Sequence, residues 1–96
     1  MGRDKLIRTI REHLPELRAR FGVRSLGLFG SYSRDEASGT SDVDLLVEFD
    51  RVPSLYEFGE MEDALSDLLG VKADLVTRRA LKPAIGRRVL REVVPI

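Results

Sequence analysis

The segment that decides the fold is "LFGSYSRDEASGTSDVDLLVEF", residues 28–49, because it joins two apolar runs through a polar stretch. The first run ends at Gly30 and Ser31, and the second begins with Asp42 and Asp44. Within the second run the odd-numbered positions are all apolar, whereas the even-numbered positions begin with the two acids. Successive residues of a strand point to opposite faces of its sheet. The second run is therefore predicted to be a strand that builds core with one face and carries two carboxylates on the other.

The rest of the chain alternates between helical and extended patterns, which predicts an α/β fold in a single domain, residues 1–96. Pro15 is expected to kink or split the first helix. Ser54 and Glu57 are predicted to form a capping box for the middle helix, and Gly70 to end it. The expected elements are a helix over residues 4–20, a strand over 23–30, a helical turn near 33–37 that Ser31 could cap, a strand over 42–49, a helix over about 55–69, a strand over 71–76 and a helix over about 83–93.

Composition narrows the class of protein. The chain has 96 residues, 43% of them hydrophobic and 33% charged, and no apolar run approaches the length of a transmembrane helix. Its first residues are charged where a signal peptide needs an apolar region, so a cytoplasmic location is expected. The absence of Cys excludes disulfides and thiolate metal sites. The absence of Asn and Gln, with Arg in large excess over Lys, hints at a thermophilic source.

Charge is unevenly distributed along a chain whose net charge is zero. Residues 1–34 and 75–96 are mainly basic, and residues 35–74 between them are mainly acidic. Part of that acidity belongs to the solvated face of the middle helix. An acidic centre between basic segments nevertheless suits a cation site that also receives an anionic ligand.

The acids of the strand over 42–49 predict a metal site. Asp42 and Asp44 would project to the same side about 6.6 Å apart along the backbone. Two carboxylates at this separation repel unless a cation lies between them, and a hard divalent ion takes oxygen ligands. Mg²⁺ is the natural candidate, and because it usually shares its protein ligands with substrate phosphates, a phosphate-bearing ligand is implied.

The Gly-Ser turn is a candidate binding site for the implied phosphates. Gly30 permits close approach of the backbone to a ligand, Ser31 adds a hydroxyl donor and Arg34 could add charge for phosphate binding. If Asp74 lies on the neighbouring strand, its carboxylate can reach the metal or accept a proton from an attacking hydroxyl. Two ions would then stabilise both oxygens of an in-line displacement.

Each of these features also has an ordinary interpretation. A Gly-Ser pair is common in loops, and an Asp-x-Asp sequence often marks a solvated strand end or an Asp-capped turn. Asp74 beside Lys72 could form no more than a surface ion pair. The functional interpretation therefore depends on the order and spacing of the three features together.

Together, "GSYSRDEASGTSDVDLLVEF" and the later Asp74 resemble the signature of the nucleotidyltransferase superfamily of DNA polymerase beta type. The chain's length and its tail, "ADLVTRRALKPAIGRRVLREVV", resemble the minimal nucleotidyltransferases, which are often encoded beside a helical HEPN toxin. The resemblance implies a mixed sheet of three to four strands with helices in αβαβαβα order. It also implies that Gly30 and Ser31 hold nucleotide phosphates, that Asp42 and Asp44 bind metals, and that Asp74 completes the metal site and assists the acceptor hydroxyl.

One position departs from the family pattern. Asp35 stands where family members often have Gly after the Arg of the loop. Asp tolerates positive φ better than most residues, but an added negative charge near phosphate is unfavourable. Nucleotide affinity and the role of Arg34 are the properties that this departure would affect.

The resemblance further implies a reaction: Mg²⁺-dependent transfer of AMP from ATP to a tyrosine of a partner HEPN toxin, with this chain as the antitoxin. The competing interpretation is an antitoxin of the same fold that neutralises its partner only by binding. Transfer to a small molecule or RNA is less favoured, and direct nucleic-acid binding is not expected, because the basic residues lack an aromatic platform. Self-association of the chain stays open.

Overall fold

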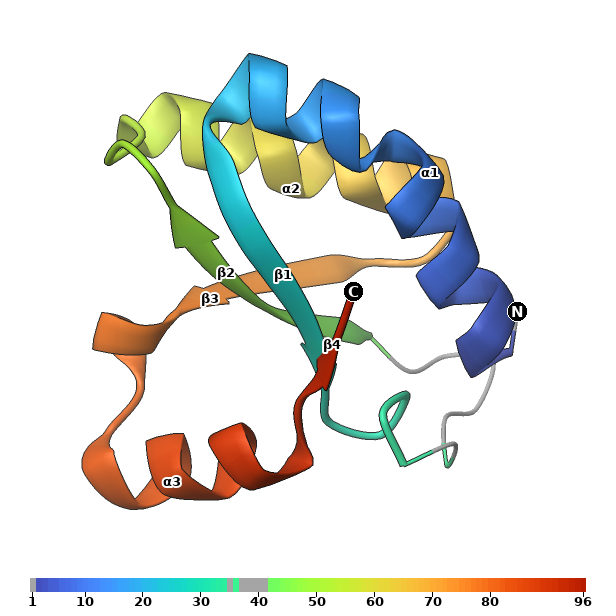
Figure 1. Ribbon diagram of the computed structural model, residues 1–96, viewed down its shortest axis with the longest axis vertical. Coiled ribbons are helices and arrows are strands. Elements are labelled where there is room, and N and C mark those ends of the chain that lie inside the picture. The colour runs from blue at the N-terminus through green and yellow to red at the C-terminus, as the bar shows by residue number, and fades with distance from the viewer. Residues whose placement is uncertain (1, 35, 37–41) are drawn as a thin grey trace.

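The computed structural model describes residues 2–34, 36 and 42–96 of the chain. Its elements pack as one mixed sheet with helices on both sides (Figure 1). In chain order they are α1 (Arg3–Phe21), β1 (Val23–Phe29), β2 (Val43–Phe49), α2 (Leu55–Leu69), β3 (Ala73–Thr77), a 3-10 turn η1 (Arg78–Ala80), α3 (Pro83–Glu92) and β4 (Val94–Pro95). The predicted α/β class with a small mixed sheet is confirmed.

The sheet has the strand order β3-β2-β1-β4. β1 is antiparallel to both β2 and β4, whereas β2 and β3 are parallel. In Figure 1, α1 and α2 lie side by side on one side of the strands and α3 lies on the other. Within the described part of the chain, no helix is both long and apolar enough to cross a bilayer.

Helix α1 forms as its apolar periodicity predicts. Its buried residues recur every three or four positions, which places them on one face. Gly22 ends the helix in the left-handed conformation, with φ of 71° and its N–H donating to the carbonyl of Arg18. Pro15 is exposed within a single continuous helix, so it does not split α1. The buried positions are Leu6, Ile10, Leu14, Leu17 and Phe21.

Helix α2 begins with the predicted capping box. The Glu57 N–H donates to Ser54 Oγ at 3.1 Å, and the Ser54 N–H donates to Glu57 Oε1 at 3.2 Å. Gly70 ends the helix with φ of 73°. Each of these contacts satisfies a backbone group that a helix end leaves unpaired. The start and end of α2 are therefore specified locally by its own sequence.

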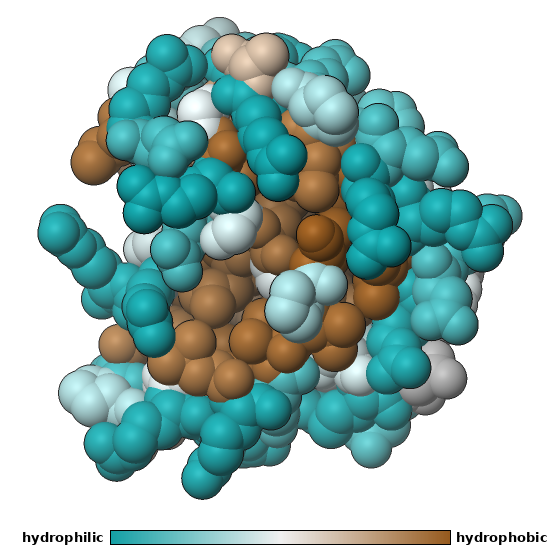
Figure 2. Space-filling view, viewed as in Figure 1, coloured by the Kyte–Doolittle hydropathy of each residue, from teal (hydrophilic) through white to brown (hydrophobic). Residues whose placement is uncertain are grey.

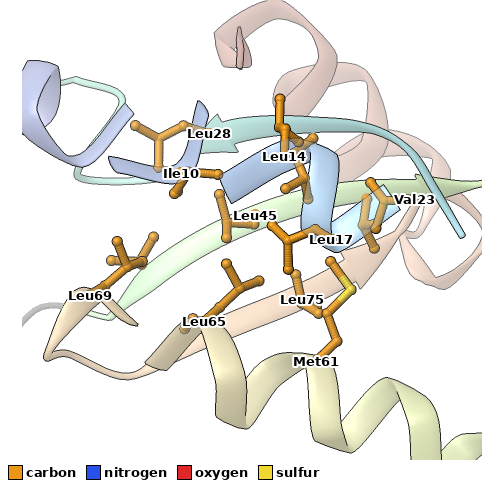
Figure 3. Close-up of a cluster of buried hydrophobic side chains, with 14 of the residues drawn as sticks. Ile10, Leu14, Leu17, Val23, Leu28, Leu45, Met61, Leu65, Leu69 and Leu75 are labelled. Carbon is orange, nitrogen blue, oxygen red and sulfur yellow. The ribbon is translucent and has the colours of Figure 1, made fainter. Parts of the chain in front are cut away.

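The core lies between β2 and the two helices α1 and α2. Val43, Leu45 and Val47 are at most 1% exposed, as the alternation along β2 predicted. Figure 3 shows Leu45 among core side chains of both helices, including Ile10 of α1 and Leu65 of α2. The odd-numbered residues of β2 thus pack in the core, and the even-numbered residues of this strand point to the opposite face of the sheet.

The opposite face of the sheet carries a row of small and apolar residues. Gly27 of β1 pairs with Leu46 of β2, which in turn pairs with Val76 of β3. A Cβ at Gly27 would overlap the side chain of Val93, so Gly27 permits the chain to cross β1 closely after α3. Figure 2 shows apolar surface gathered in the middle of the molecule between the α1–α2 layer and α3, with hydrophilic side chains around it.

Two parts of the element order differ from the expected αβαβαβα. The described part of the chain between β1 and β2 contains a turn over residues 31–34 and no helix, so the predicted helical turn with a Ser31 cap is wrong for these residues. Instead, the backbone N–H and the hydroxyl of Ser33 both donate to the carbonyl of Gly30, at 3.1 and 2.7 Å. Ala37, at the end of the predicted turn, lies outside the described residues.

The second difference is at the C-terminus. The last helix ends at Glu92, close to the predicted end, but the short strand β4 that follows it was not predicted. Val94 and Pro95 pair with β1, and the Ile96 N–H donates to the carbonyl of Leu26 at 2.9 Å. Two residues are too few to show a strand periodicity in sequence. Their pairing depends on the free edge of β1, which only the assembled sheet provides.

The outer edge of β3 gives a testable prediction about stability. Glu62 Oε2 of α2 accepts the N–H of Leu75 at 2.9 Å, which satisfies a backbone donor at the edge of the sheet. Glu62→Ala should therefore lower the free energy of unfolding by about 1–3 kcal/mol. Thermal denaturation of the variant would measure the loss.

Glu60→Ala is the matched control on the same helix. Among the described residues, Glu60 makes a partly exposed ion pair with Arg20, with 3.5 Å between Nη2 and Oε2. Such pairs contribute about 0–1 kcal/mol. Equal losses in the Glu60 and Glu62 variants would contradict the proposed role of Glu62 at the sheet edge.

Candidate active site

Strand register brings two of the predicted acids together. Asp44 pairs with Phe29 of β1 on one side and with Asp74 of β3 on the other. Directly paired residues of neighbouring strands point to the same face of the sheet. Because Val43 and Leu45 point into the core, Asp44 and Asp74 share the opposite face, at the end of the sheet where β1 leads into the Gly-Ser turn.

Gly30 lies directly against Asp44. Its φ of 76° is in the left-handed region, which strongly favours glycine. A Cβ built on Gly30 would overlap Asp44 Oδ2 and lie 3.3 Å from its Cγ. Two separate properties therefore require glycine here, namely the backbone conformation and the close approach of the Asp44 carboxylate.

Electrostatics make Asp44 an unusual carboxyl group. It is half-buried, and this burial is the main reason that its pKa is raised above the ordinary value. The negative charge of Asp74 raises the pKa further, and that of Asp42 adds a smaller effect. The three predicted acids thus interact electrostatically, although Asp42 itself is exposed and precedes the first residue of β2.

Asp74 forms the predicted ion pair with Lys72 and also lies beside Asp44 in the sheet. Its carboxylate is 35% exposed and lies 3.7 Å from the Nζ of Lys72, which is 70% exposed. An ion pair with a partner this exposed contributes little stability. Pairing with Lys72 therefore leaves the Asp74 carboxylate beside Asp44 and open to a ligand.

The Gly-Ser turn is attached to the body of the protein by burial of its residues and by a hydrogen bond from α1. Ser31 is half-buried beside Gly30, and the next two residues, Tyr32 and Ser33, are 4% and 6% exposed. Arg3, at the start of α1, donates from Nη1 to the carbonyl of Ser33 at 2.9 Å. Tyr32 packs in the main hydrophobic core. The turn is thereby fixed against the body of the protein.

Arg34 is on the surface at the end of the described turn. Its Nε lies 3.1 Å from Glu36 Oε2, and its Nη1 lies 3.1 Å from Glu92 Oε2. The hydrogen bond with Glu36 and, to a smaller extent, the charge of Glu92 raise the pKa of Arg34. Asp35, the departure from the family pattern, lies outside the described residues.

The donor set fits a Mg²⁺ ion that is shared with a substrate. The described residues contain no group of three acidic, histidine or cysteine side chains arranged to bind a metal by themselves. They do place Asp44 beside Asp74, with Asp42 close enough to affect the Asp44 pKa. One or two carboxylates together with substrate phosphates is the usual way in which proteins hold Mg²⁺.

A surface groove that is separate from these acids lies elsewhere in the described residues. It has a volume of about 620 Å³ and opens at the other end of β2 and β3, between Phe58 of α2 and Arg78 and Arg79 of η1. None of the predicted site residues lines it. We assign the candidate active site to the acids and the Gly-Ser turn, because charge, register and backbone conformation converge there.

Comparison with known proteins finds similar sequences and structures along most of the chain. A family model described as "Nucleotidyltransferase domain" matches residues 10–95. A protein of Thermococcus cleftensis named protein adenylyltransferase MntA is 56% identical over 82 residues, which cover 85% of this chain and 83% of the relative. A solved structure described as a minimal nucleotidyltransferase is 40% identical, with a TM-score of 0.83 and coverage of 100% of this chain and 97% of that one.

A more distant structural neighbour is the complex of tri-AMPylated Shewanella oneidensis HEPN toxin with MNT antitoxin. The matched chain is 22% identical, with a TM-score of 0.61 and coverage of 97% of this chain and 66% of that one. At this identity the similarity shows a shared fold.

Proposed function

This chain belongs to the nucleotidyltransferase domain family, and from that membership we propose that it transfers AMP from ATP to a hydroxyl group of a partner protein. The observation that carries the proposal is the pairing of Asp44 with Asp74, with Gly30 packed directly on the Asp44 carboxylate. This arrangement brings two carboxylates and the Gly-Ser turn together at one end of one sheet face. The name of the 56% identical relative, a protein adenylyltransferase, supports AMP as the transferred group and a protein as its acceptor.

In the proposed mechanism the chain binds the nucleotide and accepts a proton. The backbone at Gly30 and the hydroxyl of Ser31 hold the phosphates, and Arg34 contributes positive charge. The acceptor oxygen attacks the α-phosphorus of ATP and forms a new P–O bond. The bond from the α-phosphorus to its bridging oxygen breaks, pyrophosphate leaves, and Asp74 accepts the hydroxyl proton.

Three carboxylates would hold Mg²⁺ together with the phosphates: Asp42, Asp44 and Asp74. When bound, one or two Mg²⁺ ions neutralise phosphate charge and stabilise the attacking and leaving oxygens. The raised pKa of Asp44 is consistent with this role, because a cation would relieve the repulsion that the neighbouring carboxylates cause.

We further propose that the acceptor is a tyrosine of a HEPN-type toxin and that the chain acts as the antitoxin. The support is the fold shared with the MNT antitoxin of the Shewanella complex, whose toxin partner is described as tri-AMPylated. In this proposal the transferred AMP inactivates the toxin.

Position-specific labelling of ATP tests the proposed reaction. The chain is incubated with purified HEPN partner, Mg²⁺ and ATP labelled either at the α- or at the γ-phosphate. We expect stable label on the partner only from the α-labelled ATP, because the γ-phosphate leaves with pyrophosphate. Label from γ-labelled ATP would indicate phosphoryl transfer, and no label from either ATP would leave the binding-only alternative as the better account.

A further inference from the structure

Arg34 forms a hydrogen bond with the carboxylate of Glu92, near the C-terminus. We propose that Glu92, the last residue of α3, is a positioning residue that orients Arg34 toward the phosphates of the bound nucleotide. The inference rests on the proposed function, because it assigns a partner to the Arg34 of that same site. It adds a residue 58 positions away in sequence from the arginine that it positions.

The contacts form a chain of charged groups. Arg34 Nη1 donates to Glu92 Oε2 at 3.1 Å, and Arg88 Nε donates to the other oxygen, Oε1, at 3.2 Å. The Glu92 side chain is 24% exposed, whereas those of Arg34 and Arg88 are 38% and 69% exposed. Glu92 is therefore the least exposed member of the three, with both carboxylate oxygens engaged.

The backbone at Glu92 is fixed relative to the Gly-Ser turn. Val93 follows directly and packs over Gly27 of β1, where a side chain would have no room. Val94 then pairs with Leu28, two residues before Gly30. Glu92 and the turn are thus anchored on the same strand, which makes Glu92 a rigid reference point for Arg34.

The number of N–H donors on Arg34 indicates that Glu92 positions this side chain and does not block its binding to phosphate. A guanidinium has five N–H donors in a planar fork, so contacts from Nε to Glu36 and from Nη1 to Glu92 do not exhaust its capacity for a phosphate. A flexible arginine loses conformational freedom when it binds. Holding Arg34 in place beforehand lowers that cost at the moment of nucleotide binding.

The test measures nucleotide affinity of the full chain without an acceptor. In Glu92→Gln, which is isosteric, we expect the Kd for a non-hydrolysable ATP analogue with Mg²⁺ to rise roughly tenfold. In the labelling reaction the same variant should show a raised KM for ATP and little change in kcat. Glu92→Asp keeps the charge near Arg88 but shortens the reach to Arg34, so it should weaken binding similarly. Glu60→Gln is the matched control on α2 and should bind as wild type does.

A double-mutant cycle separates positioning from general stability. In an Arg34→Ala background, Glu92→Gln should cause no further change in Kd, because the residue through which it acts is gone. Additive effects would overturn the inference, as would unchanged affinity in both Glu92 variants. Tighter binding in Glu92→Gln would show that Glu92 competes with phosphate and would equally overturn it. If Arg34→Ala alone binds the nucleotide as wild type does, this inference fails. The proposed function is tested separately, by the transfer of label from α-labelled ATP and by the activity of the Asp44→Asn variant.

Discussion

Replacement of Asp44 by Asn should reduce AMP transfer by roughly three orders of magnitude or more, which corresponds to the several kcal/mol that a metal-ion site contributes. Asn keeps the size of the side chain but removes the charge that a Mg²⁺ ion requires. Asp44 lies between the Gly-Ser turn and Asp74, so no other described acid occupies an equivalent place. The measurement is the initial rate of label transfer from α-labelled ATP to the partner.

Asp63→Asn is a suitable control, because Asp63 is an exposed acid on α2. It should transfer AMP at the wild-type rate. If Asp44→Asn transfers AMP at the wild-type rate, the assignment of Asp44 to the active site is wrong. A variant that loses transfer but still neutralises the toxin would support the binding-only alternative for antitoxin action.

The same Asp44→Asn variant should be more thermally stable than wild type at neutral pH in the presence of EDTA. The pKa of Asp44 is raised in the folded state, so the folded protein holds this proton more tightly than the unfolded chain does. Stability is therefore lost as the pH rises from the unfolded pKa through the folded pKa, and the full cost is present above both. Asn avoids that cost. A Tm below that of wild type in EDTA at pH 7, or a Tm difference that does not shrink toward acidic pH, would contradict the assignment.

Sequence patterns predicted where several residues of the candidate site lie, because the spacings within each element are encoded locally. The alternation along residues 42–49 separated core positions from acids, and the register with β3 then placed Asp44 beside Asp74. The capping box at Ser54 and the glycine at position 70 likewise predicted the ends of α2. These signals are short spacings within one element, and only the neighbouring positions of Asp44 and Asp74 also require β2 to pair with β3.

The parts that sequence did not predict depend on contacts between distant segments. Glu62 contacts the backbone of β3, and Glu92 contacts Arg34 on the turn after β1. In sequence, both glutamates are indistinguishable from solvated helix residues. The strand β4 was missed for the same reason, because only the edge of β1 gives its two residues a partner. The partners of polar side chains that are distant in sequence can be identified only in the folded structure.

Gly30→Ala should impair both stability and transfer, and the two effects have separate causes. At φ of 76° an L-residue is strained by about 1–2 kcal/mol, which for a domain of this size lowers Tm by about 4–8 °C per kcal/mol. The new Cβ would also collide with Asp44 Oδ2. Relief of that collision requires the carboxylate to move, and small displacements of a catalytic group cost about a hundredfold in rate. Melting curves and the AMP-transfer assay measure the two effects independently.

Gly70→Ala isolates the first effect from the second. Gly70 has nearly the same φ, 73°, but a Cβ there would meet no atom within 4 Å. Its Ala variant should therefore lose a similar amount of stability while AMP transfer below its Tm stays close to wild type. The ratio of the two transfer rates then measures what a Cβ costs in the turn at Gly30, beyond the strain of a positive φ. Equal rates in the two variants would mean that Asp44 can shift away from a Cβ without cost, and that the close packing of the turn on this carboxylate is not needed for transfer.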